Sequence, residues 1–392
     1  MLNIFFIGLI SFFTDISTEM VYPLIPLYLT GAFGATPALV GLIEGIAESL
    51  ASLLKVFSGH LTDRFQKKKL IAFCGYAPGL LYKLALIFAG SWLGVLGARV
   101  IDRVGKGIRT SPRDVLVSES ADKENMGKAF GLHKALDMFG AGLGILIIYL
   151  LMRASGGSYD YKRLFALSMI PAVLGLVMFV FVKEKKQARQ EKQREPFWKN
   201  INKIDNQLKL YLLVVFIFTL GNSSKVFLIL KAKAVGFEEI NVILLFLIYN
   251  IVAAVLSMPL GKLSDKIGRK NLLVPGYLAF ALCYFGFAFA GTKPAIIAVF
   301  TLYGIYTAMI TGVERAFVAE IAPAELKGTM LGLHSTVAGI ALLPASVIAG
   351  QLWNMFGDAV PFVFGASLSL LSSALLIIFM KGRKVTSSLN TA

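Results

Sequence analysis

The sequence predicts an all-α membrane protein with twelve transmembrane helices arranged as two six-helix halves. Three observations support this prediction: the composition is strongly apolar, twelve segments are long and apolar enough to cross a bilayer, and the second half of the chain repeats the first. Of the 392 residues, 56% are hydrophobic and only 16% are charged. A soluble domain with this composition could not cover its surface with polar residues, so we expect a membrane protein.

The twelve predicted spans each approach the roughly 20 mostly apolar residues that a helix needs to cross the hydrocarbon core. We expect helices because, in lipid, backbone polar groups must be satisfied within their own segment. The chain begins apolar, without a basic region or a cleavage site, so we interpret its start as a helix and not as a cleaved signal. The spans are 4–30, 37–59, 70–90, 92–118, 126–152, 162–183, 209–231, 239–260, 272–290, 294–321, 328–350 and 357–381.

Lysine and arginine residues predict the orientation of the chain. One set of connections, together with the polar linker and the tail, holds 23 of them, whereas the opposite set holds 6. Positive residues collect on the cytoplasmic side, so both termini are expected in the cytoplasm, with the protein in the inner membrane. This topology accounts for the formal net charge of +16. We therefore expect the lipid bilayer, and no nucleic acid, as a partner, and we expect a monomer.

An internal repeat divides the chain into two halves. The polar stretch 184–208 separates an N-terminal half, 1–183, from a C-terminal half, 209–392. The motif GHLTDRFQKKKL follows the second predicted helix, and GKLSDKIGRKNL follows the eighth. Further on, the triplet at 131–133 recurs at 332–334, an offset of 201 that several other pairs share. A constant offset at equivalent positions indicates duplicated six-helix units.

These loop motifs resemble the signature of the major facilitator superfamily. Residues 261–270 match it fully, and 59–68 match it with Gln66 where the family has a second glycine. Arg103, Gly107 and Pro112 are similar to a second signature of the family on its fourth helix. The resemblance covers the whole chain and implies two parallel six-helix repeats that alternate access to a central site.

The glycines of the fifth predicted helix resemble those of antiporters in the same family. Gly140 and Gly144 match that pattern, although Ile145 stands where it has proline.

The loop signatures predict a cytoplasmic gate, in which carboxylates and cations pair in one state and separate in the other. The alternative is that the basic residues only enforce topology. The repeat pairs Glu314 and Arg315 with Arg113 and Asp114, which suggests a matching gate pair in the second half. The candidate gate residues are Gly59, Asp63, Arg64, Gly261, Asp265, Arg269, Arg109, Arg113, Glu314 and Arg315.

Charged residues inside the predicted spans are concentrated in the first half. Each one at mid-bilayer costs about 2.5–3.5 kcal/mol, so most of them must face the bundle interior, water or each other. Four helices place charge near one depth, and Arg99, Arg103 and Lys106 form one stripe. The alternative is a set of ion pairs that only holds helices together. The candidates for coupling or for the substrate cavity are Asp15, Glu19, Glu44, Glu48, Arg99, Arg103, Lys106, Asp137 and Lys225.

These features favour a secondary active transporter that moves a small solute by alternating access, with proton-coupled efflux of drugs or metabolites as the first hypothesis. The coupling ion could also be another ion. The cationic stripe instead suits a small organic anion or phosphate ester, in either direction. A receptor or scaffold on the same fold is a third hypothesis. We expect no enzyme, cofactor or metal site, because no nucleophile–base pair, phosphate loop or metal-ligand spacing occurs.

Overall fold

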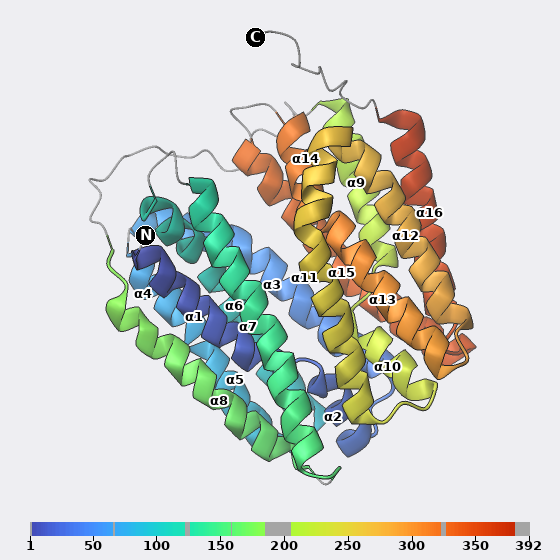
Figure 1. Ribbon diagram of the computed structural model, residues 1–392, viewed down its shortest axis with the longest axis horizontal. Coiled ribbons are helices and arrows are strands. Elements are labelled where there is room, and N and C mark those ends of the chain that lie inside the picture. Colours follow the sequence, from blue (N-terminus) through green and yellow to red (C-terminus); the bar gives the residue numbers. More distant parts are fainter. Residues whose placement is uncertain are drawn as a thin grey trace. The chain divides into compact units, whose positions relative to one another are not determined.

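The computed structural model of the protein consists of helices, and no strand occurs among the residues it describes. Those residues are 2–65, 67–121, 126–157, 159–184, 205–322 and 327–380, with the side chains of 56–57, 59–65, 126–128 and 327–329 left aside. Figure 1 shows the helices in chain order. They are α1 Leu2–Glu19, α2 Leu24–Phe33, α3 Pro37–Phe65, α4 Lys68–Tyr76, α5 Pro78–Phe88, α6 Trp92–Glu119, α7 Met126–Ala154, α8 Tyr161–Met178, the 3-10 turn η2 Phe179–Phe181, α9 Asn206–Gly221, α10 Val226–Ala234, α11 Glu239–Ile267, α12 Arg269–Phe289, α13 Lys293–Ile310, α14 Val313–Ile321, α15 Lys327–Phe356 and α16 Val360–Phe379.

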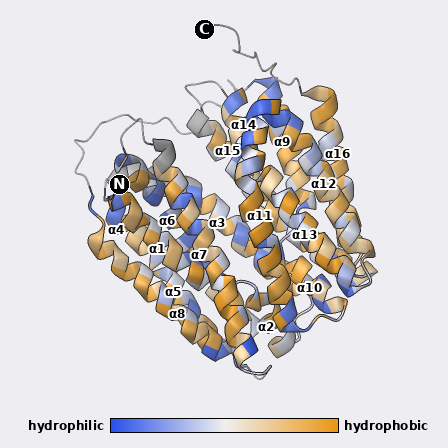
Figure 2. Cartoon of the chain, viewed as in Figure 1, coloured by the Kyte–Doolittle hydropathy of each residue, from blue (hydrophilic) through white to orange (hydrophobic). Residues whose placement is uncertain are grey.

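Apolar residues run along most helices, and hydrophilic residues gather near the helix ends (Figure 2). Among the described residues, eleven stretches are long and apolar enough to cross a bilayer. They correspond to eleven of the twelve predicted spans. The remaining span, 92–118, is the continuous helix α6, which is long enough but too highly charged for the apolar criterion. The twelve-helix prediction therefore agrees with the structure.

Four of the predicted spans are broken into two helices. Helix α1 ends before Pro23, whose missing N–H cannot continue the helical ladder, and α2 begins directly after it. The chain likewise breaks at Ala77 before Pro78, between α9 and α10, and between α13 and α14. At the last of these breaks Gly312 has a φ of +91°, a left-handed conformation that favours glycine.

The chain forms two compact units. The N-terminal unit comprises Met1–Gln193 together with Ser224–Leu247, and the C-terminal unit comprises Arg194–Ser223 together with Ile248–Ala392. In the N-terminal unit, α1 packs on α7 and α8, and α6 packs on α3, α4 and α5. In the C-terminal unit, α12 packs on α13 and α16, and α9 packs on α15 and α16. The boundaries predicted at the linker stay a prediction, because most of 184–208 lies outside the described residues.

Candidate functional site

A buried ion pair joins α3 to α6 in the N-terminal unit. Arg99 donates from Nε to Glu44 Oε1 at 2.8 Å and from Nη2 to Glu44 Oε2 at 2.6 Å. Both residues have no exposed surface. This two-pronged geometry matches the planar guanidinium to the carboxylate and satisfies most of both groups away from water. Two of the predicted charged residues therefore neutralise each other.

The pairing continues along α6 to form an ion-pair chain, which we define as Glu44, Arg99, Asp102, Arg103 and Glu48. Asp102 Oδ2 lies 3.5 Å from both Arg99 Nη1 and Arg103 Nε, and Arg103 Nη2 lies 3.0 Å from Glu48 Oε1. Three carboxylates thus face two guanidinium groups, and all of these groups are buried except the partly exposed Glu48. Such a chain offsets the cost of placing each charge within an apolar bundle.

An aromatic ring covers both arginines of this chain. The Tyr22 ring, between α1 and α2, lies 5.5 Å from the Arg99 guanidinium carbon and 6.0 Å from that of Arg103. The negative face of an aromatic ring attracts a guanidinium group at such distances. Both arginines of the predicted stripe are therefore occupied by carboxylates and by Tyr22.

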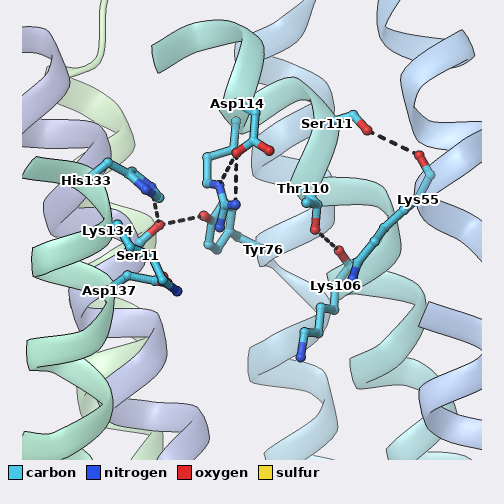
Figure 3. A network of polar contacts seen from close by, with 11 residues as sticks. Ser11, Lys55, Tyr76, Lys106, Thr110, Ser111, Asp114, His133, Lys134 and Asp137 are labelled. Atoms are coloured by element: carbon cyan, nitrogen blue, oxygen red, sulfur yellow. Dashed lines mark hydrogen bonds and ion pairs between the residues drawn. The ribbon is translucent and has the colours of Figure 1, made fainter. Parts of the chain in front are cut away.

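The other basic residues of α3 to α6 have separate surroundings. Lys106 makes no ion pair within the described part of the chain, and its backbone carbonyl accepts from Thr110 (Figure 3). Arg109 is buried, with its guanidinium carbon 4.7 Å from the Tyr76 ring centre. Lys83 is also buried, and its Nζ donates to the Gly79 carbonyl at 2.9 Å. Only part of the predicted cationic stripe is available to a ligand.

A second cluster lies between α1 and α7. The carboxyl groups of Asp15 and Asp137 lie close enough to interact, and we call them the carboxyl pair. Lys134 donates to Asp137 Oδ2 at 2.6 Å, one helical turn away. Two neighbouring carboxylates repel each other in an apolar bundle, so such a pair favours one shared proton. The structure thus brings together two of the predicted acidic residues.

A polar network joins α1, α4 and α7 next to this cluster. Ser11 Oγ lies 3.1 Å from the Tyr76 hydroxyl and 2.9 Å from His133 Nε2, as Figure 3 shows. Arg113 donates to its neighbour Asp114 through Nε and Nη2 at 3.0 and 2.9 Å. Ser11 was not among the predicted residues.

The end of α1 places Glu19 among cations of the same unit. Its charged neighbours include Lys225, Lys106 and Arg103, together with one acid, Asp137. Lys225 reaches this group because residues 224–247 belong to the N-terminal unit. The predicted candidates Glu19 and Lys225 are therefore brought together.

A tyrosine latch, made of Tyr159, Tyr161 and Glu239, fastens the start of α11 to the start of α8. Both phenol hydroxyls donate to Glu239 Oε2, and Lys233 Nζ lies 3.5 Å from Oε1. Burial raises the pKa of Tyr159, and the hydrogen bond to the Glu239 carboxylate raises it further. The latch was not predicted, because tyrosines and an acid in separate connections form no motif.

The predicted gate is described only in part. The side chains of Gly59, Asp63 and Arg64 lie outside the described residues. In the C-terminal unit, Arg269 lies 3.6 Å from Asp265 and donates to Glu320 at 3.1 Å. The carbonyl oxygen of Gly261 accepts from Ser264.

The N-terminal unit holds an equivalent ion pair, between Lys68 and Glu119. Both partners precede Arg269 and Glu320 by 201 residues. Lys68 was missed, because the offset of 202 within the loop motifs aligns Arg269 with Lys67.

The predicted gate residue Glu314 has a different surrounding from its predicted partner. Its Oε1 accepts from the Tyr277 hydroxyl at 2.9 Å, whereas Arg315 is exposed. Within the described part of the chain, no ion pair joins these two residues. Tyr277 was also missed, although it follows Tyr76 by the repeat offset of 201.

The chain is similar in sequence and in fold to known membrane transporters. The chain is 36% identical over 386 residues to an uncharacterized MFS-type transporter of Methanocaldococcus jannaschii, covering 96% of this chain and 94% of the relative. It is 26% identical to a multi-drug resistance efflux pump PmrA homolog of Lactococcus lactis, covering 89% of each. The fold is similar to that of a mutant of the nucleoside transporter NupG, with a TM-score of 0.82 at 11% identity, over 96% of this chain and 100% of that one. The Major Facilitator Superfamily model matches residues 7–232 and 210–392, and the chain therefore belongs to this superfamily of multi-pass membrane transporters.

Proposed function

We propose that the protein is a secondary active transporter that exports drug-like or metabolic small molecules by alternating access, driven by proton entry. The observation that carries this proposal is the carboxyl pair, Asp15 and Asp137, which brings two acids of α1 and α7 together. Protonation of such a pair is a reversible event inside the bundle. It supplies a coupling step that needs no cofactor.

Loss of this proton would change the packing of α1 against α7. Two neighbouring carboxylates repel each other strongly in a low-dielectric interior. The same two helices touch through glycines: a Cβ added at Gly140 or Gly144 would lie 2.4 or 2.5 Å from a carbonyl oxygen of α1. A small separation of α1 and α7 therefore breaks tight packing. Proton release at the carboxyl pair would thus favour a second arrangement of the unit.

Two further observations support export of drug-like molecules over transport of an organic anion. Arg99 and Arg103 are already paired with carboxylates, which leaves Lys106 as the cation of the stripe without an ion pair in the described chain. One relative is named a multi-drug resistance efflux pump. We retain the predicted orientation, with both termini in the cytoplasm, as part of the proposal.

Transport in proteoliposomes tests the coupling. The purified protein is reconstituted, and uphill accumulation of ethidium and of chloramphenicol is followed with and without a pH gradient. Asp15→Asn and Asp137→Asn should each abolish gradient-driven accumulation, because an amide cannot exchange a proton. Both variants should retain downhill exchange, since the substrate cavity is unchanged.

The control is Glu238→Gln, the same chemical change at an exposed carboxylate. It should behave as the unmodified protein. Gradient-driven accumulation that survives in both aspartate variants would show that coupling lies elsewhere. Absence of gradient-driven transport of either probe by the unmodified protein would contradict the proposed function itself.

A further inference from the structure

A broken helix of the C-terminal unit holds a carboxylate that the coupling mechanism does not use. Helix α13 ends at Ile310, and α14 begins at Val313 after the left-handed Gly312. Glu314 lies in the first turn of α14. Broken helices in transporters expose backbone groups and helix ends to a ligand, and a helix N-terminus stabilises a carboxylate in its ionised form.

This carboxylate has no basic partner. Tyr277 donates to Glu314 Oε1 at 2.9 Å, and no ion pair reaches Glu314 within the described residues. The side chain is half-buried, so it is neither fully solvated nor closed to a ligand. Every carboxylate of the ion-pair chain, by contrast, lies near an arginine. A lone acid in an apolar bundle is neutralised either by a proton or by a positive group from outside the chain.

Aromatic rings surround this carboxylate. The Tyr277 ring stacks on Phe218 at 4.0 Å, and Tyr211 meets Phe317 edge-on at 4.9 Å. The Tyr306 ring lies 4.9 Å from that of Phe280 and receives a hydrogen bond at its hydroxyl from Asn222, directly after α9. Two helix breaks therefore border one aromatic cluster, which consists of Tyr211, Phe218, Tyr277, Phe280, Tyr306 and Phe317.

Two buried polar atoms in this cluster lack partners. The Tyr211 hydroxyl and His334 Nε2 have no hydrogen-bond partner, and both side chains are more than nine-tenths buried. The two rings are stacked, with an interplanar angle of 10°, and Tyr211 lies within the electrostatic reach of Glu314. Native proteins rarely leave buried polar groups unsatisfied. The Tyr211 hydroxyl near Glu314, and His334 behind the Tyr211 ring, are thus polar positions that a ligand could satisfy.

We propose that Glu314 and the aromatic cluster form a binding site for lipophilic organic cations. The carboxylate supplies the opposite charge, and the negative faces of the tyrosine and phenylalanine rings attract a delocalised or quaternary cation. The Tyr211 hydroxyl and His334 are available for a polar substituent. This inference rests on the proposed export function and specifies its substrate class.

Binding to the full-length protein in detergent, without any gradient, tests the site. The probes are tetraphenylphosphonium and tetraphenylborate, which share size and shape but carry opposite charges, each measured by equilibrium dialysis. Tetraphenylphosphonium should bind saturably, and tetraphenylborate should not. Glu314→Gln should weaken tetraphenylphosphonium binding by at least about tenfold, because it removes the charge and keeps an acceptor for Tyr277.

Two variants control for folding. Glu314→Asp keeps the charge and should bind more tightly than Glu314→Gln, whereas Glu238→Gln should leave binding unchanged. Equal binding of both probes, or an unaltered affinity in Glu314→Gln, would overturn the proposal. So would a Glu314→Gln protein that binds tetraphenylphosphonium normally but loses gradient-driven chloramphenicol transport, because Glu314 would then carry a proton. The carboxyl-pair variants test the transport function separately.

Discussion

The two units use corresponding positions for different chemistry. In the N-terminal unit Arg99 and Asp102 belong to the ion-pair chain, whereas the residues 201 positions later, Phe300 and Tyr303, pack among aromatic rings. Some neighbouring residues are the same in both units: Tyr76 and His133 recur 201 positions later as Tyr277 and His334. A duplicated fold thus keeps its shape while its interior charges diverge.

The two units differ most where repeat-related residues carry opposite charges. Arg113 lies near Tyr76 in one unit, and Glu314, at the repeat-related position, bonds Tyr277 in the other. One unit therefore concentrates paired charge, and the other keeps a single acid among aromatic rings. Our proposals follow this contrast: proton coupling in the N-terminal unit and cation recognition in the C-terminal unit.

The largest effect should come from breaking the buried pair of Glu44 and Arg99. Glu44→Gln or Arg99→Met alone should lower the free energy of unfolding by about 3–5 kcal/mol, since each leaves a buried charge without its partner. The double variant should recover most of this loss, because the C-terminal unit already fills the Arg99 position with Phe300. Unfolding in an SDS titration measures both quantities.

Transport by the double variant then separates the two interpretations of the ion-pair chain. If the pair only holds α3 to α6, the stable double variant transports as the unmodified protein does. If the pair takes part in coupling, stability returns but gradient-driven transport does not. A double variant less stable than either single variant would show that the two charges do not compensate each other.

A smaller effect should follow from closing the α1–α7 contact. Gly144→Ala would place a methyl group 2.5 Å from the Ile16 carbonyl oxygen, so we expect a loss of about 1–3 kcal/mol in unfolding free energy. The repeat-related residue in the C-terminal unit, Ala345, already carries a methyl group and is buried. This contrast predicts that the close contact at this position is needed between α1 and α7 and not between the repeat-related helices α9 and α15.

Gly142→Ala is the matched control on the same helix. No atom lies within 4 Å of its added Cβ, and alanine favours a helix over glycine by about 0.5–1 kcal/mol. It should therefore be neutral or stabilising in the same titration. Equal destabilisation by both variants would mean that glycine serves flexibility here and not close packing.

Sequence reasoning was sufficient for the fold because its signals are long. Twelve apolar runs and a constant repeat offset each extend over many residues, so small errors at their ends did not alter the architecture. The helix breaks were harder to predict. Pro23 indicates the break between α1 and α2, but the break at Gly312 depends on a backbone angle. Helix α6 was predicted as one of the twelve spans, although its charged residues keep it below the apolar criterion.

The site was harder to predict than the fold, since a sequence shows which charged residues exist and not which of them form contacts. The pairing of Glu44 with Arg99, 55 positions away, depends on how α3 packs on α6. Acids and bases drew attention, so the tyrosines around Glu314 were passed over. The repeat offset of 201 relates Tyr76 to Tyr277, but this pair was not among the repeat-related positions used for the prediction.

The smallest effect should distinguish the two equivalent ion pairs, Lys68–Glu119 and Arg269–Glu320. Arg269 Nη1 also donates to the Ala316 carbonyl at 2.9 Å, so the guanidinium group binds both the Glu320 side chain and the backbone of α14. Arg269→Lys should therefore cost about 1 kcal/mol of unfolding free energy, since an ammonium cannot reproduce the fork. Lys68→Arg should cost less, because an arginine can replace a lysine that donates to one carboxylate. A larger loss from Lys68→Arg than from Arg269→Lys would show that the N-terminal pair, and not the C-terminal one, is the more closely fitted of the two.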